Sequence, residues 1–510
     1  MKQLKHRDLS VLRFLLRFCL VTLVSSLTAF YAKKKLFGRK KKYPPGPWGL
    51  PVVGILPFLD AGNPASKVLE LSKTYGPVFG GYLGGLYTVF LNDYDIIMEA
   101  FGRKNDVMSD RPQILPFIHY SRGQGVAGSF YHNNWKENRK FVMTSLNKFG
   151  VGKPVGHIAD ILETEIDYFL RDIDRRGKEH DIGGMVMMFS GNVMLQFMLG
   201  IRFDYSDTET QSYLDKLAEL FALADPANPC VLFDFLRHLP YTSNRRFIGY
   251  CDEIMSEFTE VQLQKKLDAL QMNRNSGLVD YYVSKFGDKE TGELSPAHSK
   301  NLQHLVNDLL AAGTDTTTAN TLWLLLCVIK YPEVQRNIQA EIDSVVGTAR
   351  PPRLADRERL PYTEAVGCES RRYCLAGPFS VPHSATTDTD IHGYFVPKGS
   401  MVIANAWAVS RNPELFPDPE QFKPERFLTK DGKLKLDEKV LGVTFGFGRR
   451  TCAGRHLATA EMFLILTNLL YEYNLKIEGG PDSVKLVPER GLATRPHPYK
   501  IIFEPRNNSL

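Results

Sequence analysis

The stretch that decides the fold is Phe445-Gly446-Phe447-Gly448-Arg449-Arg450-Thr451-Cys452-Ala453-Gly454. Its single cysteine, Cys452, stands just before an apolar run with helical spacing, Leu457 to Leu470. The N–H groups at a helix start and an arginine two residues upstream both favour a thiolate over a thiol. The glycines let the backbone approach a bulky planar group. A thiolate in this position suits the axial ligand of a haem iron, whereas the alternative interpretation is a small buried structural cysteine.

Length and composition indicate a large, mixed globular protein. The chain has 510 residues, of which 43% are hydrophobic, which is ample for a large core. Its seven cysteines include no CxxC pair, so neither a zinc ribbon nor a disulfide scaffold is expected. The simpler interpretation is a reducing compartment.

The net charge of +6 comes from the N-terminus alone. Residues 1–42 hold twelve Lys and Arg and one acidic residue, which leaves 51 basic and 56 acidic residues in the rest of the chain. Since the body of the protein is slightly acidic, the composition does not predict nucleic-acid binding.

The N-terminus predicts a membrane anchor. Val11 to Ala32 is apolar apart from two arginines and is followed by seven basic residues up to Lys42, which would stay on the cytosolic side. We therefore expect an anchor at 1–32, a basic and proline-rich linker at 33–51 and the globular domain at 52–510, facing the cytosol. A mitochondrial presequence is the main alternative, because its composition is also basic and poor in acids; a cleaved signal peptide fits less well.

Periodicity predicts an α+β fold that is mostly helical, with small peripheral sheets. Residues 79–92 are typical of a hairpin, 391–405 and the last 35 or so residues of strands, and helical spacing dominates from about 93 to 375. A long central helix is expected between the capping residue Ser295 and the stop signal Pro332. Within it, Ala311-Ala312-Gly313-Thr314-Asp315-Thr316-Thr317 predicts a local distortion facing a ligand, or else a kink with self-satisfied hydroxyls.

These motifs together resemble the cytochrome P450 family, in its microsomal animal type, over residues 43–505. The family pattern FxxGxRxCxG is met by Phe445, Gly448, Arg450, Cys452 and Gly454, and [AG]Gx[DE]T[TS] by Ala312, Gly313, Asp315, Thr316 and Thr317. The resemblance implies that Cys452 is the proximal ligand of the iron in haem b and that Gly313 lies over the haem. It implies catalytic roles for Asp315 and Thr316, which would supply the protons that O–O cleavage consumes.

Further matches to the family imply the remaining contacts. Arg450, with Trp135 and Arg139 from the WxxxR pattern, would hold the haem propionates, which need cationic and hydrogen-bonding partners. Arg111 and His383 align with further propionate contacts, although a purely structural histidine is the alternative at His383. The family's ExxR motif would be formed by Glu369 and Arg372, joined by Arg426, and would hold the cysteine loop; alone, such a pair would be an ordinary surface ion pair.

The resemblance implies a haem-thiolate monooxygenase that inserts one atom of O2 into an apolar small molecule, a steroid, fatty acid or xenobiotic. Electrons would come from NADPH through NADPH–cytochrome P450 reductase, with cytochrome b5 and membrane lipid as further partners at the endoplasmic reticulum. Candidate pocket residues are Phe117, Ala376, Phe379 and Val381. Two alternatives remain: a P450-fold isomerase or dehydratase that works without O2, and a non-enzymatic haem-binding protein.

Overall fold

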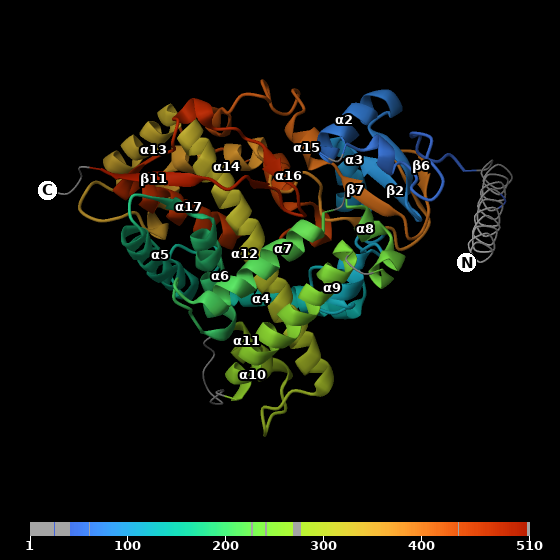
Figure 1. Ribbon diagram of the computed structural model, residues 1–510, viewed down its shortest axis with the longest axis horizontal. Helices are drawn as coiled ribbons and strands as arrows, with labels where there is room; N and C mark the ends of the chain where they lie inside the picture. The colour runs from blue at the N-terminus through green and yellow to red at the C-terminus, as the bar shows by residue number, and fades with distance from the viewer. Residues whose placement is uncertain are drawn as a thin grey trace, which may run out of the picture.

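The computed structural model describes residues 25, 41–60, 62–225, 228–239, 242–268, 277–436 and 438–506. A large helical mass lies beside a smaller region that is rich in strands, and the long helix α12 (Pro296–Lys330) passes through the middle (Figure 1). The prediction of an α+β, mostly helical fold with small peripheral sheets is confirmed.

The helices form the bulk of the domain. Before α12 they are α2 (Pro64–Tyr75), α3 (Tyr94–Ile97), α4 (Asn133–Lys148), α5 (His157–Arg176), α6 (Gly183–Leu199), α7 (Thr208–Leu223), α8 (Pro229–Leu232), α9 (Ser243–Glu253), α10 (Glu260–Asp268) and α11 (Leu278–Phe286). After it come α13 (Pro332–Val345), α14 (Pro361–Tyr373), α15 (Ala406–Ser410), α16 (Glu438–Phe445) and α17 (Arg455–Glu472). A π-helical turn at Ile254–Thr259 joins α9 to α10.

The strands of the described chain form four small sheets. They are β1 (Val78–Leu83), β2 (Leu86–Leu91), β3 (Glu179–Asp181), β4 (His383–Ser384), β5 (Thr389–Ile391), β6 (Tyr394–Val396), β7 (Met401–Ala404), β8 (Tyr473–Lys476), β9 (Pro488–Glu489), β10 (Arg495–Pro496) and β11 (Lys500–Pro505). The largest has the order β1-β2-β7-β4, in which only β2 and β7 are parallel. The others are β3-β11-β8, β10-β9 and β5-β6.

Helix α12 begins and ends where the sequence predicts. The Ser295 side chain accepts a hydrogen bond from the His298 amide at 3.4 Å, and Pro332 follows the last turn. Most of its side chains are buried, because α6, α14 and α17 pack around it. A helix that is apolar on most of its surface must be covered on most sides, which explains its central place.

The predicted distortion of α12 at Ala311–Thr317 was wrong, because the helix continues through this segment without interruption. The Thr316 hydroxyl donates to the Ala312 carbonyl at 2.6 Å and the Thr318 hydroxyl to the Thr314 carbonyl at 2.7 Å. Threonines that bond back to the carbonyl four residues earlier satisfy their hydroxyls inside the helix, and packing outweighs their weak helix propensity.

The N-terminal linker contacts the largest sheet at its described end. The Gly80 amide donates to the Pro45 carbonyl at 2.8 Å, and the Phe395 amide donates to the Lys42 carbonyl at 2.7 Å. The predicted anchor at 1–32 falls outside the described residues, apart from residue 25. Within the part of the chain that the structure describes, none of the helices has the length and apolar character needed to cross a bilayer.

Candidate active site

The cysteine loop connects the end of α16 to the start of α17. The Cys452 amide donates to the Phe445 carbonyl at 2.8 Å, which closes the loop, and Gly454 caps α17. Gly448 has φ +68°, and a Cβ there would lie 1.8 Å from the Phe101 carbonyl oxygen. Only glycine meets both conditions, so the loop can rest directly on the chain that follows α3.

The Cys452 side chain keeps solvent-accessible surface although protein surrounds it. Burial raises the pKa of the thiol, while the Gly454 amide, Arg139 and Arg455 act in the opposite direction. The start of α17 therefore favours the thiolate as predicted, but the arginines that do so are Arg139 and Arg455 and not the upstream Arg450, and burial outweighs all three groups. A metal ion would reverse this balance, since a coordinating thiol gives up its proton.

Arg450 lies at the centre of a cluster of predicted cofactor contacts. Its guanidinium donates to the carbonyls of Ser109, Val126 and Ser129 at 2.9, 3.2 and 2.7 Å. It also stacks over the Trp135 ring, 4.2 Å from the centroid, and the Trp135 indole N–H donates to the Val126 carbonyl at 3.0 Å. Carbonyl acceptors hold the guanidinium in place without neutralising it.

The other predicted propionate contacts converge on the same region. Arg111 donates to the carbonyls of Ala127 (3.1 Å), Val381 (3.3 Å) and Pro382 (2.8 Å). Arg139 donates to the Thr451 carbonyl, next to Cys452. His383 lies 2.5 Å from the Met108 carbonyl through Nδ1 and stacks on Phe101. Burial and the nearby Arg111 keep the pKa of His383 well below its ordinary value.

These arginines make no direct ion pair with a carboxylate of the described chain. Among the described residues, no carboxylate lies within 4.0 Å of the guanidinium nitrogens of Arg111, Arg139 or Arg450. Burial and mutual repulsion lower the pKa of Arg450 to about 8, and burial lowers the pKa of Arg111 to about 10. Such buried, unpaired cations are costly unless an anion joins them. Beside an accessible cysteine, this arrangement fits a group that carries both a metal and carboxylates.

Helix α12 presents an accessible face within the domain. Ala312 is exposed, and Gly313 and Thr316 are half-buried, although most of the helix is covered. Gly313 also contacts α6: a Cβ there would lie 2.6 Å from Met194 Sδ. The structure therefore gives Gly313 a packing role that the sequence did not suggest, beside the predicted one over the haem.

Asp315 and Thr316 point to different surroundings, and sequence reasoning missed the partner of the aspartate. The Arg495 guanidinium on β10 donates to the Asp315 carboxylate, which is only 1% exposed. Burial raises the pKa of Asp315 to about 6, and Arg495 opposes that shift. The two segments are 180 residues apart, so no local signal could have paired them.

Asp308 was missed as well. Its carboxylate accepts from the amides of Val126 and Ala127 at 2.7 and 2.8 Å, which ties α12 to the segment that surrounds Arg450. Burial raises the pKa of Asp308 to about 6, and Arg450 and Arg111 oppose the rise. Asp308 lies two helical turns before Asp315 and so on the same side of α12, and this spacing was the signal in the sequence that could have marked it as a candidate.

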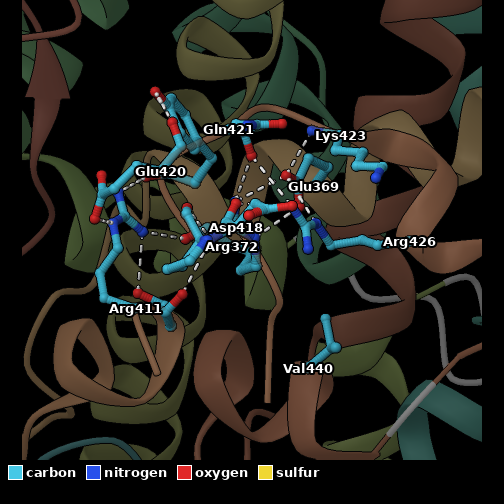
Figure 2. Close-up of polar contacts among 12 residues, drawn as sticks. Glu369, Arg372, Arg411, Asp418, Glu420, Gln421, Lys423, Arg426 and Val440 are labelled. Atoms are coloured by element: carbon cyan, nitrogen blue, oxygen red, sulfur yellow. Dashed lines mark hydrogen bonds and ion pairs between the residues drawn. The ribbon is translucent and has the colours of Figure 1, made fainter. Parts of the chain in front are cut away.

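The predicted triad is buried and complete (Figure 2). Arg372 donates to both carboxylate oxygens of Glu369 at 2.7 Å, and neither side chain is accessible to solvent. Arg426 donates to the same carboxylate at 3.2 Å, and the Lys423 amide does so at 2.8 Å. The alternative of a surface ion pair is therefore wrong for this chain.

The triad connects α14 to the irregular chain before α16. Arg372 donates to the carbonyls of Ser410 and Pro419 at 3.0 and 2.8 Å, and Arg426 donates to the Pro417 carbonyl at 2.6 Å. Beside it, α14 shares a small apolar core with this chain and α16, formed by Ala365, Cys368, Phe416, Phe427 and Val440. Since α16 ends at Phe445, where the cysteine loop begins, the triad supports the loop through the packing of α14 and the irregular chain against α16.

Comparison with known proteins decides the family. The family model for cytochrome P450 matches residues 44–503. The chain belongs to the cytochrome P450 family. It is 32% identical to cytochrome P450 2C70 of Rattus norvegicus over 91% of this chain and 95% of the relative. It is 33% identical to cytochrome P450 2C29 of Mus musculus over 91% and 94%, and 33% identical to cytochrome P450 1A1 of Oryctolagus cuniculus over 94% and 93%.

This P450 is a haem-thiolate monooxygenase with haem b as its cofactor, as the sequence predicted. Its membership of the family implies a redox partner that supplies electrons and a small molecule as substrate. The geometry agrees with that assignment: the accessible cysteine suits the iron and the arginine cluster suits the propionates.

A cavity of about 270 Å³ includes part of the predicted pocket. Phe379 lines it, together with Trp323, Leu375, Leu492 and Thr494. Neither Cys452 nor Thr316 belongs to its lining, so it lies beside the predicted site of chemistry. Of the other candidates, Phe117 and Ala376 are buried and Val381 is exposed.

We predict that Gly448→Ala abolishes correct haem ligation. The new Cβ collides with the Phe101 carbonyl and also strains the backbone, so the loop that carries Cys452 must move. The ferrous–CO complex should lose its long-wavelength Soret band. Gly446→Ala is the matched control: its φ is +78° but nothing lies within 4 Å, so it should cost about 1 kcal/mol and retain the band.

We also predict that Glu369→Gln destabilises the protein by about 3–5 kcal/mol, because Arg372 and Arg426 then lack a buried countercharge. Denaturant unfolding and haem retention measure the effect. Glu364→Gln on the same helix removes the partly buried pair with Arg357 and should cost about 1 kcal/mol. Equal losses in the two variants would contradict a special role for the shared carboxylate.

Proposed function

We propose that Cys452 is the proximal iron ligand and that Arg111, Trp135, Arg139 and Arg450 hold the haem propionates. The arginine cluster supports this assignment, because it is buried, lacks a carboxylate partner and contacts the residue next to Cys452. Phe445 and Gly454 would shape the loop around the ligand. The haem supplies the oxygen chemistry, while these side chains orient it and exclude water.

His383 would be a conditional propionate partner. Donation from Nδ1 to the Met108 carbonyl leaves Nε2 of the neutral ring as an acceptor, so only the protonated ring can donate to a carboxylate. A nearby propionate would favour that protonated form.

Thr316 and Asp315 would handle the protons of the reaction. Thr316 lies on the accessible face of α12, and its hydroxyl can exchange its bond to the Ala312 carbonyl for one to a water. Asp315, with its raised pKa, can take up and release a proton near neutral pH. Gly313 would lie over the haem, while the direction of its missing Cβ is taken by Met194 of α6.

The substrate would be an apolar small molecule such as a steroid, a fatty acid or a xenobiotic. The cavity beside Phe379 offers such molecules an apolar and aromatic part of its wall, with Trp323, Leu375 and Leu492, while charged residues such as Arg411 and Glu420 line the rest. A spectral screen that reports displacement of the water on the ferric iron would identify the class.

The electron donor would be NADPH–cytochrome P450 reductase, with cytochrome b5 as a second donor. We further propose an endoplasmic reticulum membrane location, with residues 1–32 as the anchor in contact with lipid, 33–51 as the linker and the domain at 52–510 in the cytosol. The run of basic residues that ends at Lys42 supports this orientation.

Two substitutions test the assignment of roles. Cys452→Ser should abolish the long-wavelength Soret band of the ferrous–CO complex, because the thiolate is lost. Thr316→Ala should keep the band but lower product formation by about 100-fold, since the proton supply is impaired. The matched control is Thr321→Ala, which removes a buried hydroxyl that donates to the Thr317 carbonyl at 2.9 Å within the same helix.

The monooxygenase assignment is tested with purified protein, the reductase and NADPH. We expect substrate-dependent consumption of NADPH and O2 with a hydroxylated or epoxidised product. No such consumption across a panel of lipids, steroids and xenobiotics would contradict it.

A further inference from the structure

The ion pair between Asp315 and Arg495 joins the central helix to the C-terminal strands. Arg495 belongs to β10, which pairs with β9 in a small hairpin against α12. The Asp315 side chain is 1% exposed, whereas that of Arg495 is 23% exposed. The guanidinium therefore contacts a buried carboxylate at one end and is partly accessible to solvent.

A cavity of about 220 Å³ begins at this pair. Its walls come from α12, α7 and the β9–β10 hairpin: Ala218, Glu219, Phe221, Ala222, Asp315, Glu489, Arg490, Ala493 and Arg495. The side chains of Glu219 and Glu489 are 38% and 44% exposed, so the cavity extends from the buried carboxylate to the surface. A cavity with these polar walls is suited to water.

One oxygen of Asp315 is free to use that cavity. Arg495 donates to Oδ1, while Oδ2 is buried and finds no hydrogen-bond partner among the described residues. A buried carboxylate oxygen without a donor is costly, and a water or a proton would relieve the cost.

Arg495 also favours the ionised form of Asp315, because its positive charge opposes the rise in pKa that burial causes. The other charged groups around the cavity are Asp215, Glu219, Glu489 and Arg490. Of these, Arg490 pairs with Asp225 at 2.6 Å, and Glu489 contacts His497 at 3.0 Å. Asp215 lies within electrostatic reach of Arg495, which lowers its pKa against the effect of burial.

We propose that Arg495 is a positioning residue for the monooxygenase reaction: it holds Asp315 at the inner end of the cavity between α7 and the β9–β10 hairpin, where the carboxylate takes up protons from solvent. Water in the cavity carries a proton in from solvent and transfers it to Oδ2, and the carboxylate re-forms when Asp315 releases that proton to water that serves Thr316. The expected effect on turnover rests on the proposed role of Thr316. The expected effect on the protonation of Asp315 is independent of that role.

Infrared spectroscopy of the holoenzyme tests the charge state directly. The C=O stretch of protonated Asp315 is identified as the band that is missing in Asp315→Asn. Since the pKa is about 6 in the presence of Arg495, about one tenth of Asp315 is protonated at pH 7. Arg495→Met removes the cation that lowers the pKa, so a larger fraction of the acid should be protonated at pH 7 and its titration should move to higher pH.

The matched control is Arg490→Met, which removes the same charge from the same cavity but from a residue paired with Asp225. Arg490→Met should leave the titration of Asp315 as it is in the parent protein. Arg495→Lys keeps the positive charge and should give a titration close to that of the parent. An unchanged Asp315 band in Arg495→Met would overturn the proposal. Equal shifts in both Met variants would also overturn it, because the effect would then be general.

Turnover gives the functional readout. Arg495→Met should lower product formation by about 10-fold and raise the solvent isotope effect, with substrate affinity and the ferrous–CO spectrum unchanged. A changed infrared titration with unchanged turnover and isotope effect would refute the proton-uptake role while leaving the ion pair intact. Lack of turnover in the parent protein would instead refute the proposed function.

Discussion

The carboxylate of Glu369 accepts hydrogen bonds from Arg372, which like Glu369 is fully buried, and from the partly buried Arg426. Three charges at this depth are tolerated only together, because the removal of one leaves the others without compensation. The Arg372 guanidinium also donates to the carbonyl of Ser410, at the end of α15, and to that of Pro419, in the irregular chain before α16 (Figure 2). The cysteine loop follows directly after α16, so its position depends on a salt bridge that takes no part in chemistry.

The arginines of the candidate active site differ from those of the triad in their hydrogen-bond partners. Arg111 and Arg450 are held by backbone carbonyls and not by direct ion pairs, so their positions are fixed while Asp110 and Asp308 compensate their charges only from a distance. Burial lowers the pKa of both guanidinium groups. A cluster that is prearranged in this way binds an anion without first having to break an ion pair, which favours uptake of the cofactor.

Helix α12 separates two environments with adjacent residues. Successive side chains point about 100° apart around a helix, so Thr316 faces the accessible side near the proposed haem site while Asp315 faces Arg495 and the cavity beside α7. An uninterrupted helix is enough for this division. The local distortion predicted from the sequence is not needed, because the threonine hydroxyls are satisfied by carbonyls within the helix.

The sequence by itself determined the family, the long central helix and the sheets at the periphery, and it supplied the candidate residues for the chemistry, since Cys452, the ExxR motif and the capping signals are local patterns. It could not determine which charges are balanced. The pairing of Asp315 with Arg495 and of Asp308 with the amides of Val126 and Ala127 joins segments more than 170 residues apart. Only the tertiary structure decided those pairings, because burial and the distance between charges, which set pKa values and the routes open to water, arise when distant elements pack together.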